Sequence, residues 1–88
     1  MRIDLSSVEK VESAAKLGAV EALFELGMMY STGREVEADL ITAHKWFNLA
    51  ALQGNEDAKK YRMELAREMA KDEVAEAQRM ARAWLKQE

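Results

Sequence analysis

The sequence predicts an all-α fold, a short two-layer antiparallel helical-repeat solenoid of about five helices. Its 88 residues contain no proline and only four glycines, so few positions interrupt a helix. Apolar residues recur at helical spacing along most of the chain. A pattern of alanine and glycine returns after an interval close to the roughly 34 residues of a two-helix solenoid repeat. A chain of this length has one core, so we expect a single domain over residues 1–88.

The internal repeat reads AAxxGxxxA, and its two copies begin at Ala14 and Ala50. Paired alanines end one helix where it lies close to a neighbour. Gly18 and Gly54 then stop each helix, because glycine accepts the left-handed backbone of a helix C-terminus. The last alanine of each copy opens the next helix. The repeat therefore predicts two helical corners, one 36 residues after the other.

The first part of the chain contains two of the predicted helices. One runs from about residue 7 to 17, and Ser6 and Glu9 have the spacing of a capping box at its start. The second runs from about residue 20 to 31 and shows one apolar face at helical spacing. A loop over residues 32–38 follows it.

The third predicted helix spans about residues 40–53, after an N-cap at Asp39. It is apolar almost all round, which places it at the centre of the molecule. We expect Trp46 on this helix and Tyr30 on the preceding one to be buried central aromatic residues.

Two further helices complete the predicted fold. Asn55 caps the fourth, over about residues 56–69, and Trp84 docks the last, over about residues 73–86. No glycine or proline marks the break between them at residues 70–72, so a single kinked helix is the alternative.

Composition and charge exclude several classes of function. The formal charge is −3, so the chain offers no basic surface for nucleic acid or anionic lipid. It contains no cysteine, which excludes disulfides, thiolate catalysis and cysteine-ligated metals. The longest apolar run is four residues, Leu49 to Leu52, too short for a secretory signal or a membrane-spanning helix. We therefore expect a cytoplasmic protein that binds neither nucleic acid nor membrane.

The titratable residues do not form a catalytic or metal-binding pattern. His44 is the only histidine, and no carboxylate or second imidazole lies one helical turn away, so we expect a surface or boundary histidine. Glu35, Glu37 and Asp39 alternate in the loop, but apolar residues intervene and Asp39 serves as an N-cap, which argues against calcium. We expect no catalytic, cofactor-binding or metal-binding residues, and hence no enzyme.

The candidate partner-binding residues are Glu21, Phe24, Glu25 and Met28. Phe24 and Met28 are four apart, so they meet on one face of the second helix. One hypothesis is an exposed apolar patch, rimmed by the two glutamates, that receives a hydrophobic anchor from a partner. The alternative is that Phe24 and Met28 pack on the first helix as part of the core.

The stretch from Ala22 to Ala58 follows an ordered sequence pattern. It consists of an alanine, LGxxY, a glycine-bearing loop, an aspartate, an alanine, a tryptophan–aromatic pair, two alanines and a glycine. This arrangement resembles the Sel-one-like repeat, which belongs with the tetratricopeptide-like α/α solenoids. The residues that carry the resemblance are Ala22, Leu26, Gly27, Tyr30, Gly33, Asp39, Ala43, Trp46, Phe47, Ala50, Ala51, Gly54 and Ala58.

The resemblance implies a division of the domain into one full repeat with flanking caps. Residues 22–57 are the full repeat, residues 1–21 an N-terminal capping helix and residues 58–88 a C-terminal capping pair of helices. The caps diverge from the pattern, as expected of outer faces that meet water. In the loop, Glu35 stands where the family usually carries a second glycine, a departure that concerns the loop conformation and not the fold.

The resemblance also implies a function, a non-catalytic protein–protein interaction module that acts as a small adaptor or regulator. The partner is another protein whose identity the sequence does not specify. The alternative is a self-assembling structural subunit, such as a homodimer. Residues 1–44 carry a net charge of −4 and residues 45–88 a net charge of +1, an asymmetry that would favour head-to-tail association.

Overall fold

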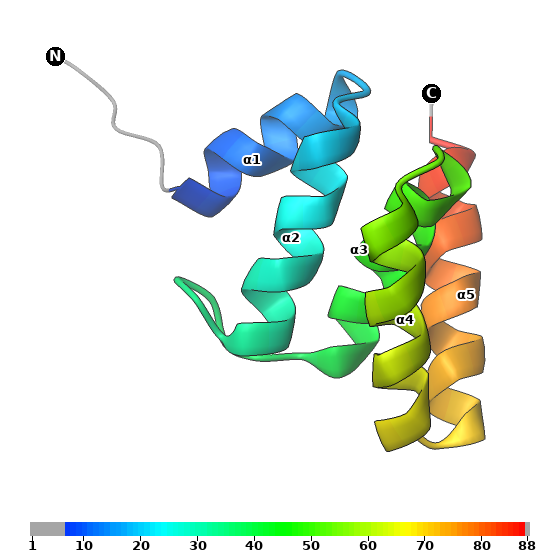
Figure 1. Ribbon diagram of the computed structural model, residues 1–88. Helices are drawn as coiled ribbons and strands as arrows, with labels where there is room; N and C mark the ends of the chain where they lie inside the picture. Colours follow the sequence, from blue (N-terminus) through cyan, green and yellow to red (C-terminus); the bar gives the residue numbers. More distant parts are fainter. Residues whose placement is uncertain (1–6, 88) are drawn as a thin grey trace, which may run out of the picture.

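The computed structural model describes residues 7–87 and consists there of helices joined by short connections (Figure 1). The five helices are α1 (Ser7–Lys16), α2 (Val20–Thr32), α3 (Leu40–Leu52), α4 (Glu56–Glu68) and α5 (Lys71–Leu85). The prediction of an all-α helical-repeat fold is confirmed. The predicted Ser6 cap lies outside the described residues.

The connections follow the local sequence. Gly18 and Gly54 have φ values of 94° and 100°, the left-handed backbone predicted for the two corners. Asp39 and Asn55 cap α3 and α4, since their side chains accept hydrogen bonds from backbone N–H groups three residues on, at 3.2 and 2.8 Å. The sequence therefore determines locally where these helices begin and end.

The break between α4 and α5 separates two helices, so the kinked alternative is not observed. Met69 and Ala70 have extended backbones with ψ values of 151° and 158°. The Glu73 carboxylate accepts a hydrogen bond of 2.8 Å from the Ala70 N–H group, which caps the start of α5. This cap stabilises the start of a separate helix although no glycine or proline lies at the break.

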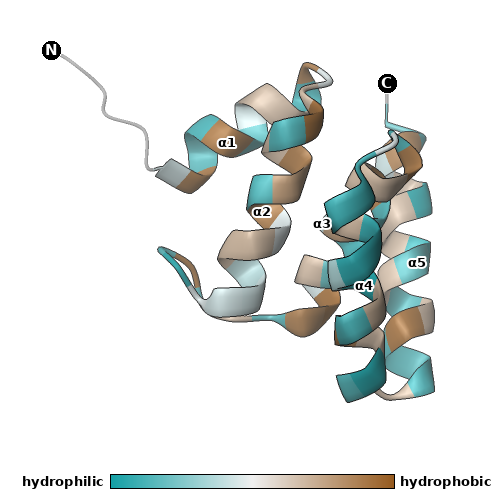
Figure 2. Cartoon of the chain, viewed as in Figure 1, coloured by the Kyte–Doolittle hydropathy of each residue, from teal (hydrophilic) through white to brown (hydrophobic). Residues whose placement is uncertain are grey.

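Helix α3 is the centre of the molecule, as predicted. It packs against α2, α4 and α5, whereas α1 packs against α2. The helix buries seven of its thirteen residues, namely Ala43, His44, Trp46, Phe47, Leu49, Ala50 and Ala51. Figure 2 shows the contrast with α4, whose residues are mostly hydrophilic.

The helices form two layers, each with its own aromatic contact. In one layer α2 meets α4, where the rings of Phe24 and Tyr61 lie edge to face with centroids 5.7 Å apart. In the other layer α3 meets α5, where Trp46 and Trp84 make an edge-to-face pair, also at 5.7 Å. Trp84 thus docks the last helix as predicted.

Two predictions about burial are wrong. Tyr30 is only half-buried, because it lies in the last turns of α2 beside the loop, and Phe47 is the fully buried aromatic instead. His44 is not a surface or boundary residue: only 2% of it is exposed, because α3 is covered by three other helices.

Within residues 7–87, no helix is long and apolar enough to cross a membrane. The division into a full repeat over residues 22–57 with caps on either side stays a prediction.

Candidate protein-interaction surface

The structure brings all four predicted partner-binding residues together at one open hollow of about 320 Å³. We call it the α2 hollow. Its lining consists of Glu21, Phe24, Glu25, Met28 and Arg34. The first four lie on consecutive turns of α2, as their spacing requires. The fifth residue, Arg34, comes from the loop after α2 and was not among the predicted partner-binding residues.

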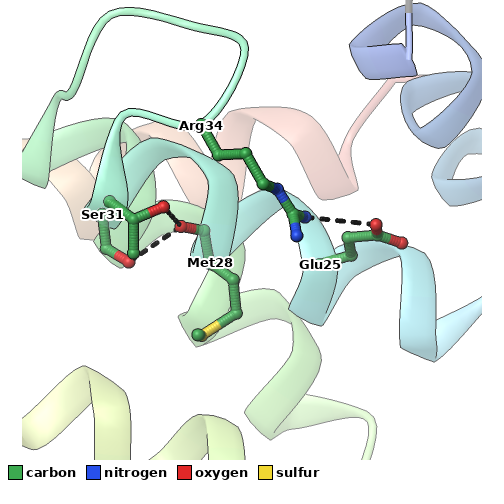
Figure 3. Close-up of polar contacts among 5 residues, drawn as sticks. Glu25, Met28, Ser31 and Arg34 are labelled. Carbon is green, nitrogen blue, oxygen red and sulfur yellow. Dashed lines mark hydrogen bonds and ion pairs between the residues drawn. The ribbon is translucent and has the colours of Figure 1, made fainter.

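The loop turns back at Gly33 and so carries Arg34 to the hollow. Gly33 has a φ of 77°, and the N–H groups of Gly33 and Arg34 both donate to the Met29 carbonyl, at 2.8 and 3.0 Å. Figure 3 shows the arginine side chain reaching along the helix to Glu25, with Nη2 3.2 Å from Oε2. Both side chains are about half exposed, so the ion pair adds little stability and can open for a ligand.

The end of α2 is held by two side chains that contact the same carbonyl. The hydroxyls of Ser31 and Thr32 donate to the Met28 carbonyl at 3.1 and 2.8 Å, and Figure 3 shows these contacts beside the Met28 side chain. These two bonds hold the last turn of α2, next to the point where Met28 lines the hollow.

The floor of the hollow rests on an aromatic cluster formed by Phe24, Phe47 and Tyr61. The half-buried Phe24 ring lies 5.6 Å from Phe47, which in turn stacks on Tyr61 at 5.3 Å with an angle of 15° between the rings. The alternative prediction was that Phe24 and Met28 pack on the first helix. For Phe24 it is wrong, because the ring lies against Phe47 of α3 and Tyr61 of α4. Phe24 is thus part of the core on one side and lines the surface on the other.

The rim of the hollow carries one carboxylate that is free to pair with a ligand. Glu25 is already paired with Arg34, whereas the exposed Glu21 makes no ion pair within residues 7–87. Three charged side chains on the lining therefore sum to one negative charge. An apolar side chain flanked by a cation complements this combination of apolar floor and acidic rim.

The one histidine is not placed for chemistry at the surface. His44 lies within the core on α3, and burial, followed by the charge of Arg62, lowers the pKa of its imidazole. Among the described residues no group of three or more acidic, histidine or cysteine side chains is arranged to hold a metal ion.

The fold and this surface define a class of protein. Antiparallel helices in two layers, joined at left-handed glycine corners, form a short α/α solenoid. The Sel1 repeat family model matches residues 20–55, which span α2, the loop, α3 and the second corner. The chain therefore carries a Sel1 repeat over these residues.

The chain is also similar to the alginate biosynthesis protein AlgK of Azotobacter vinelandii. The two are 31% identical over 77 residues, which cover 88% of this chain and 17% of AlgK. The chain thus spans less than a fifth of that relative. No solved structure shows a significant match.

Proposed function

We propose that this protein is a non-catalytic interaction module, a small adaptor or regulator that binds a partner protein at the α2 hollow. Sel1 repeats generally mediate contacts between proteins, which supports the general class. The observation that carries the specific proposal is the convergence of Phe24, Met28 and the free Glu21 carboxylate on one hollow. Since the chain covers a small part of AlgK, we carry no role in alginate biosynthesis over to it.

The lining indicates what the partner presents. A hollow of about 320 Å³ accommodates one large apolar side chain, and Phe24 and Met28 provide the contact surface. A lysine or arginine beside that anchor would pair with Glu21. Because methionine adapts its shape and Phe24 is held by the aromatic cluster, the site combines one flexible and one fixed contact.

Self-assembly is the second candidate, and the uneven charge along the chain favours it. The acidic first half and the slightly basic second half could join head to tail, which would make association weaken with salt. Light scattering at two protein concentrations and two salt concentrations distinguishes a stable homodimer from a monomer that binds a different protein.

The test is affinity capture from a lysate of the native cells, read by mass spectrometry. We choose Glu21→Lys/Met28→Ser as the variant, because a change at Phe24 would also disturb the aromatic cluster. The matched control is Glu37→Lys/Met63→Ser, which makes the same chemical changes at exposed residues outside the hollow. Circular dichroism verifies that all three chains fold alike.

We expect one protein to be captured by the wild type and the control and to be lost with the Glu21/Met28 variant. Equal capture by the wild type, the variant and the control would show that the partner binds at another surface. Recovery of this chain alone would favour self-assembly. The cytoplasmic location expected from the sequence stays a prediction, which fractionation of the same cells tests.

A further inference from the structure

A second surface lies on the other layer of the fold and shares no residue with the α2 hollow. Two adjoining hollows of about 400 and 270 Å³ have Lys16, Trp84 and Gln87 in common and together form what we call the indole groove. Helices α1, α3 and the end of α5 contribute its lining. The smaller hollow is lined by Glu12, Lys16, Lys45, Trp46, Trp84 and Gln87.

The aromatic wall of the groove is rigid. Trp46 and Trp84 make the edge-to-face contact that docks α5, and Trp46 is 5% exposed. The ammonium nitrogen of Lys45 lies 4.0 Å from the centroid of the Trp46 ring, within the range of a cation–π contact. The indole thus holds this cation in place at the groove.

The groove is lined by two lysines that pair with no carboxylate among the described residues. Lys16 and Lys45 make no ion pair within residues 7–87, although Glu12 lines the same groove. Burial lowers the pKa of Lys45, while Glu12 and Asp39 act in the opposite direction. The indole nitrogen of Trp46 is buried without an acceptor among the described residues, and such a donor is costly to leave unpaired.

We propose that the indole groove binds an acidic peptide segment, with its carboxylates paired to Lys16 and Lys45 and an apolar side chain packed on Trp84. The lining carries two positive charges and one negative, so it selects an anionic ligand, opposite to the α2 hollow. A peptide suits the groove better than nucleic acid does. Only two lysines are available for phosphates, and the whole chain carries a charge of −3, which repels a polyanion.

The chain has its own reporter for this site. It contains two tryptophans, Trp46 and Trp84, and both line the groove, whereas the α2 hollow contains none. Intrinsic tryptophan emission of the full chain therefore follows occupancy of the groove. The probe is a blocked peptide of alternating glutamate and leucine, and the matched probe has glutamine in place of every glutamate.

We expect a saturable change in emission with the glutamate peptide that is weakened by salt and absent with the glutamine peptide. Lys16→Glu, at an exposed position, should weaken binding about tenfold or more, because a charged hydrogen bond is lost and a repulsion is gained. Lys45→Met, which keeps an apolar stem over the indole, should act in the same direction. Lys60→Glu/Lys71→Glu is the control for charge at exposed residues outside the groove, and binding should change by less than about twofold.

An unchanged emission spectrum, or equal binding of the two peptides, would overturn the proposal. Tighter binding of a single-stranded oligothymidine at the same lysines would replace it with a nucleic-acid site. The inference is independent of the proposed function, since Glu21→Lys/Met28→Ser should leave the peptide titration unchanged. Failure at one surface is therefore distinguishable from failure at the other.

Discussion

A β-carbon on Gly27 would lie 2.5 Å from two carbons of the Phe47 ring. The ring is fully buried and is held between Phe24 and Tyr61, so it has no room to move away. Helix α2 can lie this close to α3 because residue 27 has no side chain. The contact thus explains a mid-helix glycine, and the same ring supports Phe24 at the floor of the α2 hollow.

Gly27→Ala should therefore destabilise the protein by about 1–3 kcal/mol, the usual cost of overpacking a core. This is the reverse of the intrinsic helix preference, which favours alanine over glycine by about 1 kcal/mol. Urea unfolding followed by circular dichroism measures the change. In a Phe47→Leu background the smaller side chain should relieve much of the penalty. A Gly27→Ala protein as stable as the wild type would refute the close-packing explanation.

Removal of the Trp46 side chain should be the most damaging single truncation. Trp46→Ala should cost about 3–5 kcal/mol, because it empties a buried site and removes the surface on which Trp84 docks. Trp46→Phe should cost much less, since the indole nitrogen has no acceptor within residues 7–87. Thermal melts of both variants test this order. A Trp46→Ala chain that melts cooperatively near the wild-type midpoint would contradict it.

The features that the sequence predicted correctly are those that depend on neighbours along the chain. A glycine corner needs a left-handed backbone at one position, and Gly18 and Gly54 supply it. An aspartate or asparagine cap needs an N–H group three residues on, as at Asp39 and Asn55. The central position of the third helix was predictable for a related reason, because a helix that is apolar all round has to be covered on several sides.

The features that the sequence did not reveal depend on residues brought together from different helices. Arg34 reaches Glu25 only because the loop turns back at Gly33. The neighbours of Phe24 are set by how α2 crosses α3 and α4, which its spacing on α2 does not specify. His44 is buried because α2, α4 and α5 all cover α3, and its neighbours along the chain do not reveal this.

Glu35→Gly should stabilise the loop. Glu35 has a φ of 65°, a left-handed conformation that costs an L-residue with a β-carbon roughly 1–2 kcal/mol. Glycine avoids this cost but loses more chain entropy on folding, so the net gain should be about 0.5–1 kcal/mol. Glu37→Gly is the matched control. Glu37 has a negative φ, so glycine relieves no strain there and should only destabilise the protein. Denaturant midpoints that move in the same direction for both variants would show that strain at residue 35 is not relieved.

His44 should make the protein less stable as the pH falls through the range from about 7 to 5. Burial, followed by the charge of Arg62, lowers the pKa of His44 in the folded chain, while the unfolded value is about 6.5. Near and below that unfolded value the unfolded state takes up a proton that the folded state does not. The unfolding free energy therefore falls with decreasing pH, by at most about 1.4 kcal/mol per pH unit, until the folded pKa is passed.

Urea midpoints measured across this pH range test the prediction, because aspartate and glutamate titrate mainly near pH 4. His44 is the only histidine in the chain, so the slope is assigned without ambiguity. His44→Gln should flatten the profile even if it lowers stability at every pH. A wild-type profile that is flat, or a slope that persists in the variant, would show that the buried imidazole is not the group that takes up the proton on unfolding.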